Sequence, residues 1–212
     1  MSGSHSPSFS RRRFLRALAA SAAPAAFLMQ ARGICEEKGQ LVLTATPAVG
    51  EPLKLTPEET AGPFFRPNSP AKTNLREPGV SGTPLKLTGF VLSRKGDPIS
   101  EALLDFWHAD DRGEYDFRGY RCRGHQFTGA DGQYALETIV PGLYPGRTRH
   151  YHVRLQAAHG PILSTQLYFP NEARNGSDSL FMPELLLGVR KSEPGLVATF
   201  NFVLETAANR FA

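Results

Sequence analysis

Hydrophobic and polar residues alternate over short stretches in the second half of the chain, and turn-forming residues separate these stretches. The pattern predicts β-strands over 85–93, 102–109, 133–140, 150–157, 162–169 and 196–205. Short strands at this spacing, with no strong helical period after residue 33, favour an all-β fold. We expect an antiparallel β-sandwich with immunoglobulin-like layering, in which residues 183–188 form one helical turn.

The segment 34–84 has a different character, because it holds eight prolines and shows little periodicity. Such a stretch is expected to be an extended arm that packs over a core without forming one. The predicted layout is therefore a leader over 1–33, a proline-rich arm over 34–84 and a β-sandwich domain over 85–212.

The leader carries the positive charge of the chain. Residues 1–33 contain five arginines and no acidic residue, so the net charge of +4 becomes −1 over the other 179 residues. Ser-Arg-Arg-Arg-Phe-Leu at 10–15 precedes a mostly apolar stretch, 17–29, that is too short to span a bilayer. This arrangement resembles a twin-arginine export signal cut before Ile34. We expect a periplasmic or extracellular protein that binds neither nucleic acid nor, once the leader is removed, the membrane.

Cys35 and Cys122 are the only cysteines. An oxidising compartment would permit a disulfide between them, but two cysteines alone do not define a pairing. Two thiolates are also too few for a cysteine-rich structural zinc site. The sequence leaves the bridge open, and it leaves the oligomeric state open too.

The first candidate for chemistry is the pair His150 and His152. Residues two apart on a strand share a face, so both imidazoles point the same way, as in many sites for first-row metals. The pair alone also fits two core or solvent-facing histidines. Neighbouring turns offer further ligands: acidic residues at 110, 111, 114 and 116, and the phenols of Tyr115 and Tyr144.

Several short motifs around these residues occur in a recognisable order. Trp-His-Ala-Asp at 107–110 and Gly-Glu-Tyr at 113–115 precede Pro-Gly-Leu-Tyr-Pro at 141–145, Arg147 and the His150-x-His152 pair. This order resembles the intradiol ring-cleavage dioxygenases, the relatives of catechol and protocatechuate dioxygenases. Matching segments at 60–65, 96–99, 131–134 and 165–169 extend the resemblance over about residues 56–170. Only five residues separate Tyr144 from His150, which indicates a compact member of the family, and the leader indicates an exported one.

The resemblance implies a non-haem ferric ion, Fe(III), held by Tyr115, Tyr144, His150 and His152. Phenolates match a hard trivalent ion, and coordination should remove the phenol proton despite an ordinary pKa near 10. In the family a catechol-type substrate displaces one tyrosinate, which is Tyr144 here. The ring then opens between its two hydroxylated carbons with both atoms of O2. A small aromatic diol and O2 are the implied partners.

Two more residues take roles by the same resemblance. Arg147 matches an arginine three residues before the first histidine, where fixed positive charge stabilises carbanion character in the bound ring. Gln166 matches a glutamine near the ligand shell that orients a ligand or a water.

Two other interpretations of the same residues stay open at this point. One is a non-catalytic β-sandwich that binds carbohydrate or protein, with the histidine pair incidental. The other is a divalent-metal enzyme that uses His150, His152 and a nearby acid such as Glu114.

Overall fold

The structure is a computed structural model that describes residues 51–206. Its strands are β1 (Pro84–Ser93), β2 (Leu103–Trp107), β3 (Arg123–Phe127), β4 (Gln133–Ile139), β5 (His150–Gln156), β6 (Ile162–Tyr168), β7 (Gly188–Ser192), β8 (Gly195–Thr199) and β9 (Phe202–Leu204). Two short 3-10 turns, η2 (Ala173–Gly176) and η3 (Pro183–Leu185), follow β6. The described residues contain no helix long and apolar enough to cross a membrane.

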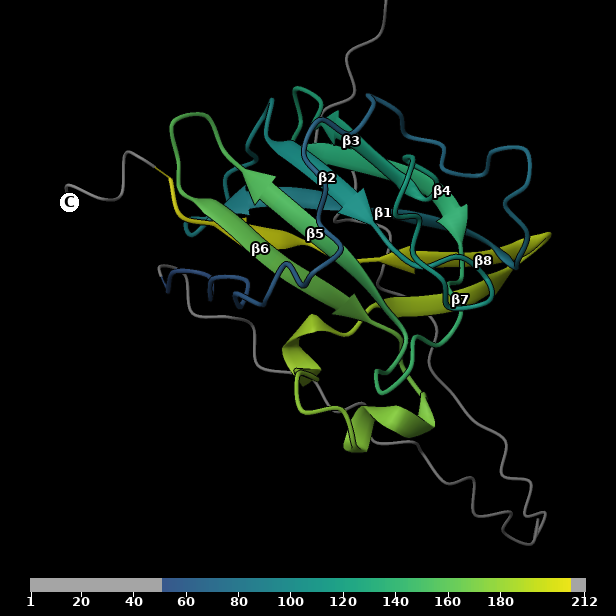
Figure 1. The fold of residues 1–212 in the computed structure, drawn as a ribbon. Coiled ribbons are helices and arrows are strands. Elements are labelled where there is room, and N and C mark those ends of the chain that lie inside the picture. The colour runs from purple at the N-terminus through teal and green to yellow at the C-terminus, as the bar shows by residue number, and fades with distance from the viewer. Residues whose placement is uncertain (1–50, 207–212) are drawn as a thin grey trace, which may run out of the picture. The chain divides into compact units, whose positions relative to one another are not determined.

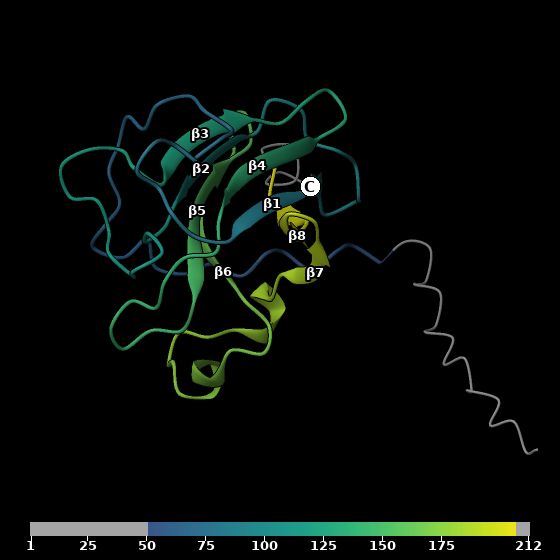
Figure 2. The same cartoon turned by 90° about the vertical axis from the view of Figure 1, so that its right-hand side faces the viewer.

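The strands form two sheets that pack face to face (Figures 1 and 2). One sheet has the order β3-β2-β5-β6, and the other has the order β4-β1-β8-β7 with β9 also paired to β1. Alternate residues point inward from both sheets, among them Leu87, Phe106, Leu136, Val153 and Leu167, and all five are fully buried. The predicted all-β sandwich is confirmed.

The structure differs from the expected strand list in three places. The predicted strand 196–205 is two strands, β8 and β9, and both run parallel to β1, so that sheet is mixed. Strands β3 and β7 were not predicted, because RGHQF and GVRKS contain too few apolar residues for a clear alternation. The helical turn expected over 183–188 is η3, which covers Pro183–Leu185.

The described part of the proline-rich segment, residues 51–83, forms no regular strand and crosses the surface of both sheets. Backbone hydrogen bonds join Thr56 to Val203, Glu59 to Ser164 and Leu75 to Glu137. The Leu75 side chain is fully buried in the main core. These contacts fix residues 59–65 beside β6 and over the outer face of the β3-β2-β5-β6 sheet, where the candidate site lies.

Candidate active site

Strand β5 is buried on both faces, and this places its two histidines. Tyr151 and Val153 enter the core between the sheets, whereas His150 and His152 point to the outer face. Neighbouring segments cover that face: the His152 ring stacks on Trp107 of β2, with centroids 5.0 Å apart. A Cβ at Gly62 would lie 3.3 Å from the same imidazole. Both histidines are therefore shielded from water, and their rings still meet each other edge to face.

Three predicted ligand atoms converge on this face. The Tyr115 Oη lies 3.2 Å from His150 Nε2 and 3.1 Å from His152 Nε2, and the two Nε2 atoms are 3.2 Å apart. Tyr115 is only 4% exposed, and the ring of Phe64 stacks on it at 4.2 Å. The sequence prediction that these three side chains share one site therefore agrees with their positions.

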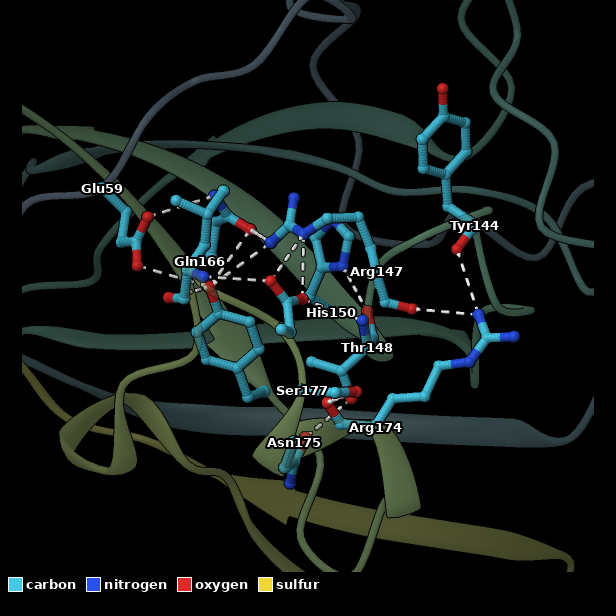
Figure 3. Close-up of polar contacts among 12 residues, drawn as sticks. Glu59, Tyr144, Arg147, Thr148, His150, Gln166, Arg174, Asn175 and Ser177 are labelled. Atoms are coloured by element: carbon cyan, nitrogen blue, oxygen red, sulfur yellow. Dashed lines mark hydrogen bonds and ion pairs between the residues drawn. The ribbon is translucent and has the colours of Figure 1, made fainter.

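Tyr144 lies beside this cluster, but its hydroxyl does not join it. The ring of Tyr144 is 5.6 Å from that of Tyr115 and meets Phe64 edge to face at 5.3 Å. Within residues 51–206 its hydroxyl makes no hydrogen bond, and Figure 3 shows the side chain directed away from Arg147 and His150. Tyr144 is half-buried, so its side chain has more freedom than that of Tyr115.

The loops that carry the two tyrosines touch at a pair of glycines. Gly113 has a φ of +85°, and a Cβ there would lie 2.3 Å from the carbonyl oxygen of Leu143. A Cβ at Gly142 would lie 2.2 Å from the backbone nitrogen of Gly113. The Gly142 N–H also donates to the carbonyl of Asp110 at 2.7 Å. Only glycine at both positions permits this approach, which brings Tyr115 and Tyr144 together.

The proton positions on His150 follow from its contacts. Its Nδ1 lies 2.7 Å from the carbonyl oxygen of Thr148, so Nδ1 carries the proton and Nε2 keeps a free lone pair. Burial lowers the pKa of His150 to about 4 and that of His152 well below its usual value. Both imidazoles are therefore neutral at neutral pH, as metal binding requires. The buried Nδ1 of His152 has no partner among the described residues.

Tyr115, unlike the two neutral histidines, would have to lose a proton to bind a metal ion. Burial raises the pKa of its phenol, and the positive charges of Arg147 and Arg123 oppose that rise only in part. A phenolate at this position therefore needs a cation directly on its oxygen. The Nε2 lone pair of His150, the neutral imidazole of His152 and one such phenol form a donor set that fits an iron ion, so the residues present fit the metal that the resemblance implies.

Arg147 and Gln166 belong to a polar network next to the histidines (Figure 3). The Arg147 Nη2 donates to Gln166 Oε1 at 2.7 Å, and its Nε donates to Asp178 Oδ2 at 2.9 Å. Gln166 Nε2 donates to the carbonyl of Thr60 at 3.2 Å and to Glu59 at 3.4 Å. Both predicted residues thus lie together, and the guanidinium has a fixed direction.

Sequence reasoning missed two acidic members of this network, Glu59 and Asp178. Glu59 precedes the matched segment 60–65 by one residue, and burial raises the pKa of its carboxyl. Burial also opposes ionisation of Asp178, but N–H groups of Thr148 and Leu180 and the charge of Arg147 hold its pKa below the usual value. The sequence offered only an indirect signal for these two acids: an arginine expected in the site, Arg147, needs an acidic partner when it is partly buried.

The carboxylate alternative does not agree with the geometry. The side chain of Glu114 is 67% exposed and pairs with Arg112, not with the histidines. Among the described residues, no group of three or more histidine, cysteine or acidic side chains could hold a metal ion. Cys122 is buried, whereas Cys35 lies outside the described residues, so the question of a bridge between them stays open.

The fold and this tyrosine–histidine cluster are those of an all-β enzyme, and comparisons with known proteins agree. Residues 60–211 match the family model described as Dioxygenase. A chlorocatechol 1,2-dioxygenase from Rhodococcus opacus is 30% identical over 183 residues, which are 68% of this chain and 70% of that enzyme. A hydroxyquinol 1,2-dioxygenase from Nocardioides simplex is 34% identical over 116 residues, 51% of this chain and 40% of its own.

A solved structure gives the same result. The dioxygenase domain of a dioxygenase–carbohydrate-binding protein fusion from Streptomyces sp. SirexAA-E is 54% identical, with a TM-score of 0.71 over 73% of this chain and all of that domain. The chain belongs to the intradiol ring-cleavage dioxygenase family. It is therefore an oxidoreductase, and the interpretation as a non-catalytic binding module is wrong.

Proposed function

We propose that this chain is a non-haem Fe(III) dioxygenase that uses O2 to cleave a catechol-type ring between its two hydroxylated carbons. The convergence of Tyr115 Oη, His150 Nε2 and His152 Nε2 within 3.2 Å supports the proposal most directly. The names of the related enzymes from Rhodococcus and Nocardioides support a catechol-type substrate.

Tyr115, Tyr144, His150 and His152 would hold the iron. When bound, a ferric ion would be a Lewis acid that the substrate diol can chelate and that would draw electron density from the ring. Tyr115, whose ring stacks on that of Phe64, would stay in place throughout the reaction. Tyr144 is half-buried in a loop with glycine and proline on both sides. Its side chain could therefore move out of the ligand position, and its oxygen could then accept a proton from a substrate hydroxyl.

Arg147 and Gln166 would act on the bound ring from one side. The guanidinium cannot lose its proton, so it supplies fixed positive charge where negative charge develops on a ring carbon. Gln166 accepts from Arg147 and donates to the Thr60 carbonyl, which fixes its amide orientation and holds the guanidinium in place.

The visible spectrum of the purified chain, with iron measured on the same sample, tests the proposal. We expect about one iron per chain and a red-brown tyrosinate-to-iron band that shifts when catechol is added without oxygen. The variant Tyr115→Phe should lose the band. The control Tyr120→Phe should keep it, because the Tyr120 hydroxyl donates to the carbonyl of Pro67 outside the cluster. A protein that stays colourless after ferrous loading and exposure to air would refute the proposal.

We also propose that the chain leaves the cytoplasm by the twin-arginine route, to the periplasm or the medium. The arginine pair and the apolar stretch that follows support this, and both lie outside the described residues. The route carries folded proteins, so a chain that binds iron before export would suit it.

A further inference from the structure

Asp178 is a buried carboxylate between η2 and η3 that no motif in the sequence singled out. Its side chain is 2% exposed and accepts hydrogen bonds from three donors. The Arg147 Nε donates at 2.9 Å, the Thr148 N–H at 2.8 Å and the Leu180 N–H at 3.0 Å. A buried carboxylate with all these donors is a rigid acceptor, because losing the Arg147 guanidinium would leave its charge without a counter-ion in a place shielded from water.

The first consequence concerns Arg147. A free arginine side chain has many rotamers, but here Nε is held by Asp178 and Nη2 by Gln166. These two contacts hold two different nitrogens of the planar guanidinium, so together they fix both its position and its plane. Without Asp178 the group would keep only the contacts of Nη2, to Gln166 and, at 3.5 Å, to the Tyr168 hydroxyl.

The second consequence concerns His150 and passes through the backbone. Asp178 accepts the N–H of Thr148, and the carbonyl of Thr148 accepts the Nδ1–H of His150 at 2.7 Å. The Thr148 side chain is held too, since its hydroxyl donates to Asn175 Oδ1 at 2.6 Å. The residue that fixes the His150 tautomer is thus anchored by the loop that carries Asp178.

We propose that Asp178 is a positioning residue that holds the Arg147 guanidinium and the Thr148 backbone in one arrangement. It thereby prepares an arginine and a histidine at the same site. Its effect on catalysis rests on the proposed function, whereas its effect on Arg147 and His150 does not depend on any bound metal.

A neighbouring ion pair provides a matched control. Glu172 accepts from Arg149 Nε at 2.8 Å, so it joins the same loop to the same segment by the same kind of contact. Both partners are about one-fifth exposed, and neither contacts the tyrosine–histidine cluster. Glu172→Gln therefore removes one carboxylate–arginine contact of this loop, as Asp178→Asn does, without touching Arg147 or Thr148.

The first measurement is proton–nitrogen NMR of the metal-free full chain. In the unmutated protein we expect slowly exchanging signals from Arg147 Nε–H and His150 Nδ1–H. Asp178→Asn should remove the arginine signal and make the histidine proton exchange faster, whereas Glu172→Gln should preserve both. If the folded, unmutated protein shows neither protected proton, the proposal is wrong, and this result requires no variant to fold.

The second measurement uses the iron-loaded protein. Asp178→Asn should weaken anaerobic catechol binding and lower kcat/KM by about 10- to 100-fold, the usual effect of removing a partner that orients a site residue. Glu172→Gln should change both catechol binding and kcat/KM by less than about threefold. Equal losses in both variants, or none in Asp178→Asn, would overturn the proposal. An enzyme without colour or ring cleavage would instead refute the proposed function, and the NMR result would stand.

Discussion

His108 makes the stability of this fold sensitive to acid in a way that can be calculated. The side chain is fully buried: its Nδ1 lies 2.7 Å from the carbonyl of Ala109 and its Nε2 lies 2.6 Å from the Thr138 hydroxyl. Burial lowers its pKa from 6.5 to about 4. The folded state therefore holds a neutral imidazole under conditions in which the unfolded chain binds a proton.

The direction of the effect follows from proton binding. Between the folded and unfolded pKa values the unfolded state holds more protons, so the free energy of unfolding falls as the pH falls. The contribution of His108 is complete above its unfolded value of 6.5 and is lost towards its folded value of about 4. From about pH 7.5 to about pH 5, linkage gives a loss of about 2 kcal/mol from this one group. That is a large share of a typical total stability of roughly 5–15 kcal/mol.

Urea unfolding of the chelator-treated chain at the two pH values measures this loss, and the variant His108→Gln isolates it. The variant starts less stable at about pH 7.5, because it loses buried hydrogen bonds. Its deficit should shrink by about 2 kcal/mol at about pH 5, since all other titrating groups cancel in the difference. His159→Gln is the matched control, because it makes the same substitution at an exposed histidine. A His108→Gln deficit that stays constant with pH within about 0.5 kcal/mol would refute the burial argument.

Three further outcomes follow from the site and the leader. Gly113→Ala should cost roughly 2 kcal/mol or more in urea unfolding and weaken the iron band, because its Cβ would lie 2.3 Å from the Leu143 carbonyl; an unchanged protein would contradict this. Glu114→Gln should leave iron content and spectrum unchanged, whereas loss of iron would revive the divalent-metal interpretation. Arg11→Lys with Arg12→Lys keeps the charge but removes both guanidinium groups, so the precursor should remain in the cytoplasmic fraction on immunoblots; normal export would exclude the twin-arginine route.

Local patterning predicted the strands that depend on it. Residues 133–138 alternate between exposed and buried positions, and the expected strand over 133–140 ends within one residue of β4. Strand β3 has no such pattern. It is held in place by pairing with β2 on one side and by the bridge between Ala71 and His125 on the other. A strand defined by its partners cannot be predicted from its own residues.

The parallel pairing of β1 with β8 and β9 has a similar explanation. Between β6 and β8 the chain passes through η2, η3 and β7, and this crossing returns it to the other sheet beside β1. Parallel strands need a long connection, and the length of a connection does not reveal where it ends. The sequence therefore predicted two layers of strands but not their order.

The residues of the candidate site also fall into a predictable and an unpredictable group. His150 and His152 were predictable because a strand fixes which residues share a face. Tyr115 and Tyr144 were predictable only because the order of motifs resembles that of a known family. Asp178 and Glu59 were not predictable, since each enters the site from a segment without periodicity. Their positions depend on contacts with Arg147 and Gln166 that only the folded chain makes.

The two tyrosines differ in their surroundings, and this difference suits the different tasks proposed for them. Tyr115 is 4% exposed, stacks on Phe64 at 4.2 Å and touches both imidazoles, so moving it would disrupt the cluster. Tyr144 has only edge-to-face ring contacts and an unbound hydroxyl within the described residues, so its side chain can turn at little cost. A ligand that must leave when substrate arrives needs such freedom. The packing alone therefore favours Tyr144, and not Tyr115, as the exchangeable ligand.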